Sequence, residues 1–362
     1  MNPFSLDTNL LQRHTVEIYN LDKQDGVLET VEARSLLSPK RFDLFAKLFY
    51  LKYKETEPEI ARKLYLKHIK AFNPDGKEPG RDDKSSWEDF LKFFDNLTDN
   101  LRNHGFDKTL SLVPVGKDNI ILDGAHRISI LAYLNQPVKI CRFDKVLSKG
   151  PFDYNYFINR GLPRDMADLI ALEATNWLPE VRIACIWPRL ENARKKDAEE
   201  CMLNKSFPIF YDREFSISRK ALTLLVTQFF QDQDWIGGQE HGYTAAMDNT
   251  YRYFARNRKI QFVFFVGDRS QSVSEIKEAI RETISYGKRL IYITDTSQEA
   301  MDLAKTILDE KERKDWLYLN NMASFYGKIH ERTSEGITYF RNIVWLGFKA
   351  RLARMLHTLS PE

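Results

Sequence analysis

An aspartate, a glycine, a histidine and an arginine fall within five consecutive positions, Asp123-Gly124-Ala125-His126-Arg127, and an apolar run lies on either side of them. This order predicts a strand, a tight glycine turn and a helix whose first turn carries an imidazole and a guanidinium. The start of a helix presents unpaired N–H groups and the positive end of the helix dipole. The stretch therefore predicts an anion site, most naturally for phosphate, in which Asp123 can hold a metal ion or take a proton.

The alternative interpretation is a plain strand–turn–helix connection whose charges face water. The neighbouring elements weigh against it. Residues 87–104 have the pattern of an amphipathic helix, and residues 110–115 have that of a short strand with a turn after it. Residues 136–143 predict another strand beyond the motif.

This order resembles the ParB/sulfiredoxin fold, in which a helix, a strand, a hairpin and a glycine turn lead into a second helix. The resemblance covers about residues 75–145. The matching stretches are Gly105-Phe106, Val113-Pro114-Val115, Ile121-Leu122-Asp123-Gly124-Ala125-His126-Arg127 and Val138-Lys139-Ile140.

Within that family the turn is most similar to the Asp-Gly-His-His-Arg motif of free-serine kinases. Sulfiredoxins carry a cysteine where this chain has Ala125, which excludes their sulfinic acid chemistry. ParB proteins continue into a helix-turn-helix domain, and no clear one follows here. The resemblance implies that Gly124, Ala125, His126 and Arg127 bind ATP phosphates. It also implies that Asp123 lies at the transferred phosphoryl group or its Mg²⁺, with Glu78 as the general base.

The segment 73–86 supplies further charges close to the motif in sequence. It holds two prolines, two glycines, and the charged residues Lys77, Glu78, Arg81 and Lys84. Such a loop is either a solvated surface linker or part of an active site. In the second case Lys84 is a phosphate ligand.

Composition sets limits on the class of protein. The 362 residues, 43% of them hydrophobic, are enough for two domains. The net charge of +3 is too small to indicate nucleic acid as a partner. The three cysteines form no C-x-x-C pair, which indicates a reducing compartment without structural zinc. The chain shows neither a signal peptide nor an apolar run long enough to span a membrane, so we expect a cytoplasmic protein.

The remaining patterns predict an α+β fold with helices and strands in both halves. In the first half we expect two strands at 14–21 and 27–33, and helices at 44–53, 57–72 and 164–178. We expect three parts: a ParB/sulfiredoxin-like nucleotide-binding domain over 1–170, an α/β domain over 180–325 and a helical tail over 326–362.

The second half contains its own polar turn, Thr294-Asp295-Thr296-Ser297-Gln298-Glu299, at the end of an expected strand. One interpretation is a helix cap, with Thr296 as N-cap and Glu299 closing a capping box. The other adds Lys277 and Arg281, four residues apart on one helix face, as anion ligands beside Asp295.

This half is also similar to C-terminal regions encoded with surface-polysaccharide genes. The similarity rests on Trp187-Pro188, Trp235-Ile236-Gly237, and Thr294-Asp295-Thr296 with Glu299. It implies that the substrate is a sugar or a glycan carrier.

Residues 339–359 have the pattern of a basic amphipathic helix. Such a helix packs on the protein itself, lies on a membrane surface or forms an oligomer contact. The second option would place a cytoplasmic protein at the inner face of the membrane.

Taken together, these patterns predict a kinase that uses ATP and Mg²⁺ to phosphorylate a hydroxyl of a sugar or glycan, within polysaccharide biosynthesis. A nucleotide-gated binding module without rapid turnover is the first alternative. A nuclease is the second, and the modest charge weighs against it.

Overall fold

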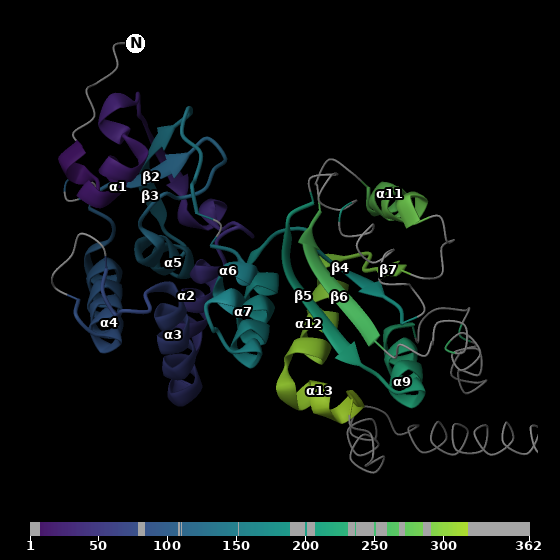
Figure 1. Cartoon of the computed structure of the whole chain (residues 1–362). Helices are drawn as coiled ribbons and strands as arrows, with labels where there is room; N and C mark the ends of the chain where they lie inside the picture. Colours follow the sequence, from purple (N-terminus) through teal and green to yellow (C-terminus); the bar gives the residue numbers. More distant parts are fainter. Residues whose placement is uncertain are drawn as a thin grey trace, which may run out of the picture. The chain divides into compact units, whose positions relative to one another are not determined.

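The computed structural model describes residues 8–78, 84–107, 109, 111–150, 152–188, 200, 207–230, 236, 250, 259–267, 272–284 and 291–317. The chain divides into two compact units, and the described helices and sheets make it an α+β protein (Figure 1). The first unit holds residues 1–181 together with Phe207–Tyr211 and Phe265–Asp268. The second unit holds the remainder.

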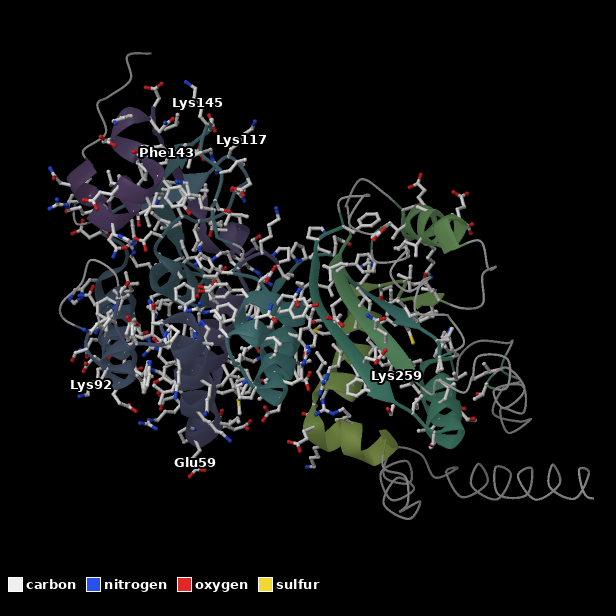
Figure 2. All side chains as sticks on the ribbon, viewed as in Figure 1. Glu59, Lys92, Lys117, Phe143, Lys145 and Lys259 are labelled. Carbon is white, nitrogen blue, oxygen red and sulfur yellow. The ribbon has the colours of Figure 1, made fainter. Side chains whose placement is uncertain are left out.

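A three-stranded sheet of order β1-β3-β2 lies at one end of the first unit. Strand β3 (Pro137–Phe143) is central: β1 (Val27–Glu32) pairs with it antiparallel, and β2 (Val113–Gly116) pairs with it in parallel. Apolar side chains of β3 face the interior, whereas charged ones near the strand ends face solvent. Figure 2 shows Phe143 inside this region and Lys145 pointing away from it.

Helices form the other end of the first unit (Figure 1). The central one is α2, whose residues from Phe42 to Leu51 are all buried, and it packs against α3, α5 and α7. Around it lie α3 (Pro58–Phe72), α4 (Trp87–His104), α5 (Ala125–Tyr133), α6 (Tyr154–Asn159) and α7 (Arg164–Trp177); α2 itself spans Phe42–Tyr53. The start of α4 is fixed by a capping box between Ser86 and Asp89.

Two expected strands are wrong. Residues 14–21 form the helix α1 (Arg13–Tyr19), which carries Val16 and Tyr19 on the side that packs on a cluster around Leu11 and Phe143. Their spacing of three is helical, and β-branched residues in this stretch concealed it. Residues 120–122 form no strand: Ile121 makes a single antiparallel bridge with Val115.

A four-stranded sheet of order β5-β6-β4-β7, in which β4 and β7 run antiparallel, lies mainly in the second unit. The strands are β4 (Val181–Ile186), β5 (Ile209–Ser216), β6 (Lys259–Val266) and β7 (Ile291–Ile293). The helices are α9 (Arg219–Phe230), α11 (Val273–Ile284), α12 (Ser297–Leu308) and α13 (Glu310–Leu317).

Several expected features lie outside the described residues. They are Arg81, Trp235 and Gly237 of the stretch Trp235-Ile236-Gly237, and the amphipathic tail at 339–359. Among the helices that the structure describes, none has the length and apolar content to cross a membrane.

Candidate functional site

The helix α5 opens on Gly124 without a capping side chain. Gly124 adopts the left-handed conformation, with φ 88° and ψ 24°. A Cβ at this position would also lie 3.0 Å from Nη2 of Arg127 and 3.2 Å from Cγ2 of Val113. The first helical hydrogen bond runs from the N–H of Ile128 to the carbonyl of Gly124. The preceding N–H groups are therefore available to an anion at the start of the helix.

Asp123 and Arg127 face each other across this first turn. Nη2 of Arg127 donates to Oδ2 of Asp123 at 3.1 Å, and Nη1 donates to the carbonyl of Leu112 at 3.2 Å. The two side chains are 24% and 17% exposed, so both border solvent. The guanidinium of Arg127 thus lies beside the uncapped helix start, where an anion bound to the helix N–H groups would also contact it.

His126 lies against the aromatic side chains of neighbouring helices. Its Nε2 is 2.9 Å from the hydroxyl of Tyr65, and its ring packs 4.9 Å from that of Phe94. Burial, and then the charges of Lys47 and Lys84, hold the pKa of His126 well below its ordinary value. The imidazole is therefore neutral near pH 7, and it would contribute to a phosphate site through a neutral ring nitrogen.

The structure brings Glu78 and Lys84 into the same region. Their side chains form an ion pair in which Lys84 is 1% exposed and Glu78 25% exposed. The ammonium of Lys84 also lies 3.9 Å from the centre of the Phe93 ring, and that ring contacts His126 edge to face. Lys84, predicted as a phosphate ligand, and Glu78, predicted as the general base, are thus neighbours of the α5 turn.

A buried group of charges on and before α2 escaped the sequence analysis. Arg41 binds both carboxylate oxygens of Asp43, at 2.8 and 2.9 Å, and donates to the carbonyl of Ile121 at 2.7 Å. Lys47 donates to Oδ2 of Asp43 at 3.1 Å. Burial alone would raise the pKa of Asp43, but Arg41 and Lys47 hold it far below its usual range. All three side chains are at most 4% exposed.

This charged group connects the two predicted parts of the site. Asp123 acts electrostatically on Arg41, and Glu78 acts on Lys47. The set comprises four cations (Arg41, Lys47, Lys84 and Arg127) and three carboxylates (Asp43, Glu78 and Asp123). With neutral imidazoles beside them, these groups leave a positive excess in a largely buried place, which favours an anionic ligand.

His68 is a further buried polar residue next to this group. It is 1% exposed, and its ring lies 5.2 Å from that of Phe157. Neither ring nitrogen makes a hydrogen bond, although the backbone of Tyr65 lies close enough to act on the ring. Burial, and then Lys47, hold its pKa well below the ordinary value of 6.5.

One signal in the sequence pointed to these missed residues. Asp43 and Lys47 are charges four residues apart inside an otherwise apolar helix pattern, where a solvated face is absent. That pattern marks charges that are buried and paired.

The polar turn of the second unit is satisfied by its own side chains. Thr296 caps α12 by accepting from the N–H of Glu299 at 3.0 Å, and Glu299 accepts from the N–H of Asp295 at 2.6 Å. Lys277 forms an ion pair with Asp295. The side chain of Arg281 lies outside the described residues. The structure thus gives the geometry of a helix cap, with Lys277 brought to it.

Asp123 has the right chemistry for one magnesium contact. One carboxylate suffices when phosphate oxygens complete the octahedron, and Oδ1 of Asp123 has no hydrogen-bond partner among the described residues. Within the same residues, no group of three His, Cys, Asp or Glu side chains forms a metal site without a phosphate.

Two surface hollows lined by described residues lie apart from these groups. One, of about 410 Å³, is lined by the basic outer side of α3 and by Trp87. The other, of about 360 Å³, lies beside Gly105 and Val138. The chemistry of the first unit is therefore concentrated in a packed cluster at the start of α5. No family model, no curated protein and no solved structure matches this chain.

Proposed function

We propose that the first unit binds ATP and transfers its terminal phosphoryl group to a hydroxyl. The observation that carries this proposal is the uncapped start of α5 at Gly124, beside a cluster with more cations than carboxylates. Phosphoryl transfer needs mainly positioning and neutralisation of charge, and this cluster supplies both. The proposal includes a ParB/sulfiredoxin-like layout for the unit, supported by α5 following an Asp-Gly turn next to a small mixed sheet.

In this proposal Arg127, Lys84 and the N–H groups of the first α5 turn hold the phosphate oxygens. Asp123 holds Mg²⁺, which when bound neutralises charge on the phosphates. Glu78 accepts the proton of the acceptor hydroxyl, and its ion pair with Lys84 holds the carboxylate in position. The acceptor oxygen forms a bond to the terminal phosphorus while the bond to the bridging oxygen of ADP breaks.

The proposed acceptor is a sugar or a glycan end, in a cytoplasmic step of surface-polysaccharide biosynthesis. This part is supported by the resemblance carried by Trp187-Pro188 and Thr294-Asp295-Thr296. The basic pattern of residues 339–359 is consistent with a peripheral contact at the inner face of a membrane.

A nucleotide-gated binding module is a second candidate, and one observation favours it. Both carboxylates that transfer requires are engaged in ion pairs, Asp123 with Arg127 and Glu78 with Lys84. A site in that state can bind a nucleotide and change conformation without rapid chemistry. The two candidates differ in product, not in ligand.

The test measures binding and chemistry separately. Isothermal titration with ATP, GTP and CTP, each with and without Mg²⁺, reports binding, and mass spectrometry of sugar and glycan acceptors reports transferred phosphate. Arg127→Met should weaken nucleotide binding at least tenfold, whereas Lys277→Met, which removes a paired cation from the second unit, should leave it unchanged.

Each outcome assigns a function. Binding with phosphate on an acceptor supports the kinase. Binding without transfer across the acceptor panel supports the gated module. Loss of neither binding nor turnover in Arg127→Met would refute both.

A further inference from the structure

We infer that Lys47 and His68 form the subsite that receives the terminal phosphate of the nucleotide. Asp43 holds the ammonium of Lys47 in place until the ligand arrives. The identity of the ligand rests on the proposed function, but the anion site itself follows from contacts of α2 and α3.

Lys47 keeps one hydrogen-bond donor for a ligand. Arg41 already occupies both oxygens of Asp43 and neutralises this carboxylate. Lys47 shares one of those oxygens at 3.1 Å and approaches the carbonyl of Asp43 at 3.3 Å. An ammonium has three N–H donors, so one of them remains for a ligand. Lys47 is thus the surplus cation of a buried group.

His68 is the second member of the proposed subsite. A neutral imidazole has one donor and one acceptor, and in His68 neither makes a hydrogen bond. The residue is 1% exposed, so its ring nitrogens do not reach bulk solvent. Leaving such a group unsatisfied destabilises the fold, and such groups in native proteins call for a functional explanation.

Lys47 and His68 contact the same aromatic ring. The ammonium of Lys47 lies 6.0 Å from the centre of the Phe72 ring, and the ring of His68 lies 6.4 Å from the same centre. On its other side His68 contacts Tyr65, whose ring also contacts that of His126. His126 belongs to the first turn of α5. The pair therefore adjoins the helix start at which the other phosphates are proposed to bind.

The polar groups at this site match an anionic ligand. An ammonium, an imidazole N–H and the positive end of a helix are all donors or positive groups, and they match a phosphate oxygen. Glu78, a quarter exposed, is paired with Lys84, which packs on the Phe93 ring beside His126, so we place the approach from solvent on the side of Glu78. A terminal phosphate entering there would take the third N–H of Lys47 and the N–H of His68.

The experiment uses inorganic tripolyphosphate, which tests the anion site without a base or a sugar. Its dissociation constant is measured by isothermal titration for the full chain and for Lys47→Met, His68→Leu and Lys67→Met. Lys67 is the matched control because it is an exposed lysine next to His68 in the sequence, on the outer side of α3. We expect at least tenfold weaker binding for Lys47→Met, about fivefold for His68→Leu, and less than twofold for Lys67→Met.

A second measurement guards against variants that fail to fold. The ring nitrogens of His68 in the unmodified protein, observed by ¹⁵N NMR, should shift when tripolyphosphate is added. Thermal melting of His68→Leu should occur at a higher temperature than for the unmodified chain, since two unsatisfied buried atoms are removed. A purely structural histidine would show the second effect without the loss of affinity.

The outcomes separate this inference from the proposed function. Unchanged affinity in Lys47→Met and His68→Leu, unmoved ring nitrogens, or no binding of tripolyphosphate overturns the subsite. Binding that depends on Lys47 and His68, without consumption of ATP, supports the subsite and removes the kinase. Turnover of ATP that Lys47→Met leaves unchanged supports the kinase and overturns the subsite.

Discussion

Two helices of this protein begin after a polar turn that contains an aspartate, and they begin in opposite ways. The start of α12 is closed by its own side chains, with Thr296 and Glu299 accepting the local N–H groups. The start of α5 is a left-handed glycine with no side-chain cap. The turn before α12 is complete by itself, whereas the turn before α5 leaves N–H donors for a ligand.

The surroundings of the two turns differ in the same sense. Asp295 is 62% exposed beside Lys277, an arrangement that water screens. Near Asp123, the group of Arg41, Asp43 and Lys47 is almost wholly buried. A buried excess of positive charge beside an uncapped helix is costly unless a ligand uses it. On our proposal, function belongs to the turn before α5 and stability to the turn before α12.

The strongest test of this contrast replaces the corresponding aspartates. Asp123→Ala should lower transfer of phosphate from ATP by about 10²–10³-fold, as losses of a charged transition-state contact do. Asp295→Ala should leave transfer unchanged. Product formation is followed by ³¹P NMR, and circular dichroism checks that both variants are folded. Normal turnover in Asp123→Ala would show that this carboxylate has no part in the reaction.

The second prediction concerns pH, because buried histidines occur in the first site and not at the start of α12. The folded-state pKa values of His68 and His126 lie well below the unfolded value of 6.5, so the unfolded chain binds more protons. Stability is therefore fully present above pH 6.5 and falls as the pH drops from there, by about 1.4 kcal/mol per pH unit for each histidine.

This loss can be separated from that of the neighbouring groups. Despite burial, Asp43 holds the pKa of Arg41 above its ordinary value, so Arg41 stays charged in this range, and the depressed pKa of Asp43 makes it respond at a much lower pH. Urea unfolding at pH 7.5, 6.5 and 5.5 measures the slope, which His68→Leu should roughly halve. Replacing the exposed His104 by Gln should not alter it. A flat profile in the unmodified chain would contradict the neutral imidazoles.

The third prediction sharpens the role of the glycine. Gly124→Ala should destabilise the first unit by about 1–2 kcal/mol through its left-handed backbone. It should also weaken nucleotide binding, because the added Cβ presses on Arg127. Gly161→Ala is the control: its φ is 86°, and an added Cβ would meet nothing within 4 Å. Equal effects of both changes on binding would mean that the contact with Arg127 is irrelevant.

The smallest expected effect belongs to the closed turn. Thr296→Ala should lower the stability of the second unit by about 1 kcal/mol, the usual cost of a lost N-cap. Nucleotide affinity should stay the same. Chemical denaturation and titration calorimetry measure the two quantities, and a change in affinity would show that the second turn also takes part in binding.

Much of the fold could be predicted from local patterns. The helix at 87–104 coincides with α4, since its apolar spacing and the Ser86 cap are both local signals. The structure also has helices close to the expected 44–53 and 57–72. The wrong strand at 14–21 came from β-branched residues, whose preference was overridden by packing of α1 on the cluster around Leu11.

The site was harder to predict than the fold. Local order was enough to find the turn from Asp123 to Arg127, and Lys84 and Glu78 fell in one charged segment. The apolar pattern around Asp43 and Lys47 indicates buried charges, but their proximity to the α5 turn depends on tertiary contacts that the sequence does not show. For the same reason the neutral state of His126 could not be foreseen, since it depends on burial and on the charges of Lys47 and Lys84 from other elements.

The pairing of β1 with β3 has a consequence for how the protein is made. Glu29 and Arg142 meet across this pair although 113 residues separate them in the chain. On the ribosome, the early strand must wait until its late partner has emerged, while α2, α3, α4 and α5 are synthesised in the interval. Such long-range closure slows folding. A nascent chain that stops before β3 should therefore contain Asp123 and Arg127 but lack the folded site around them.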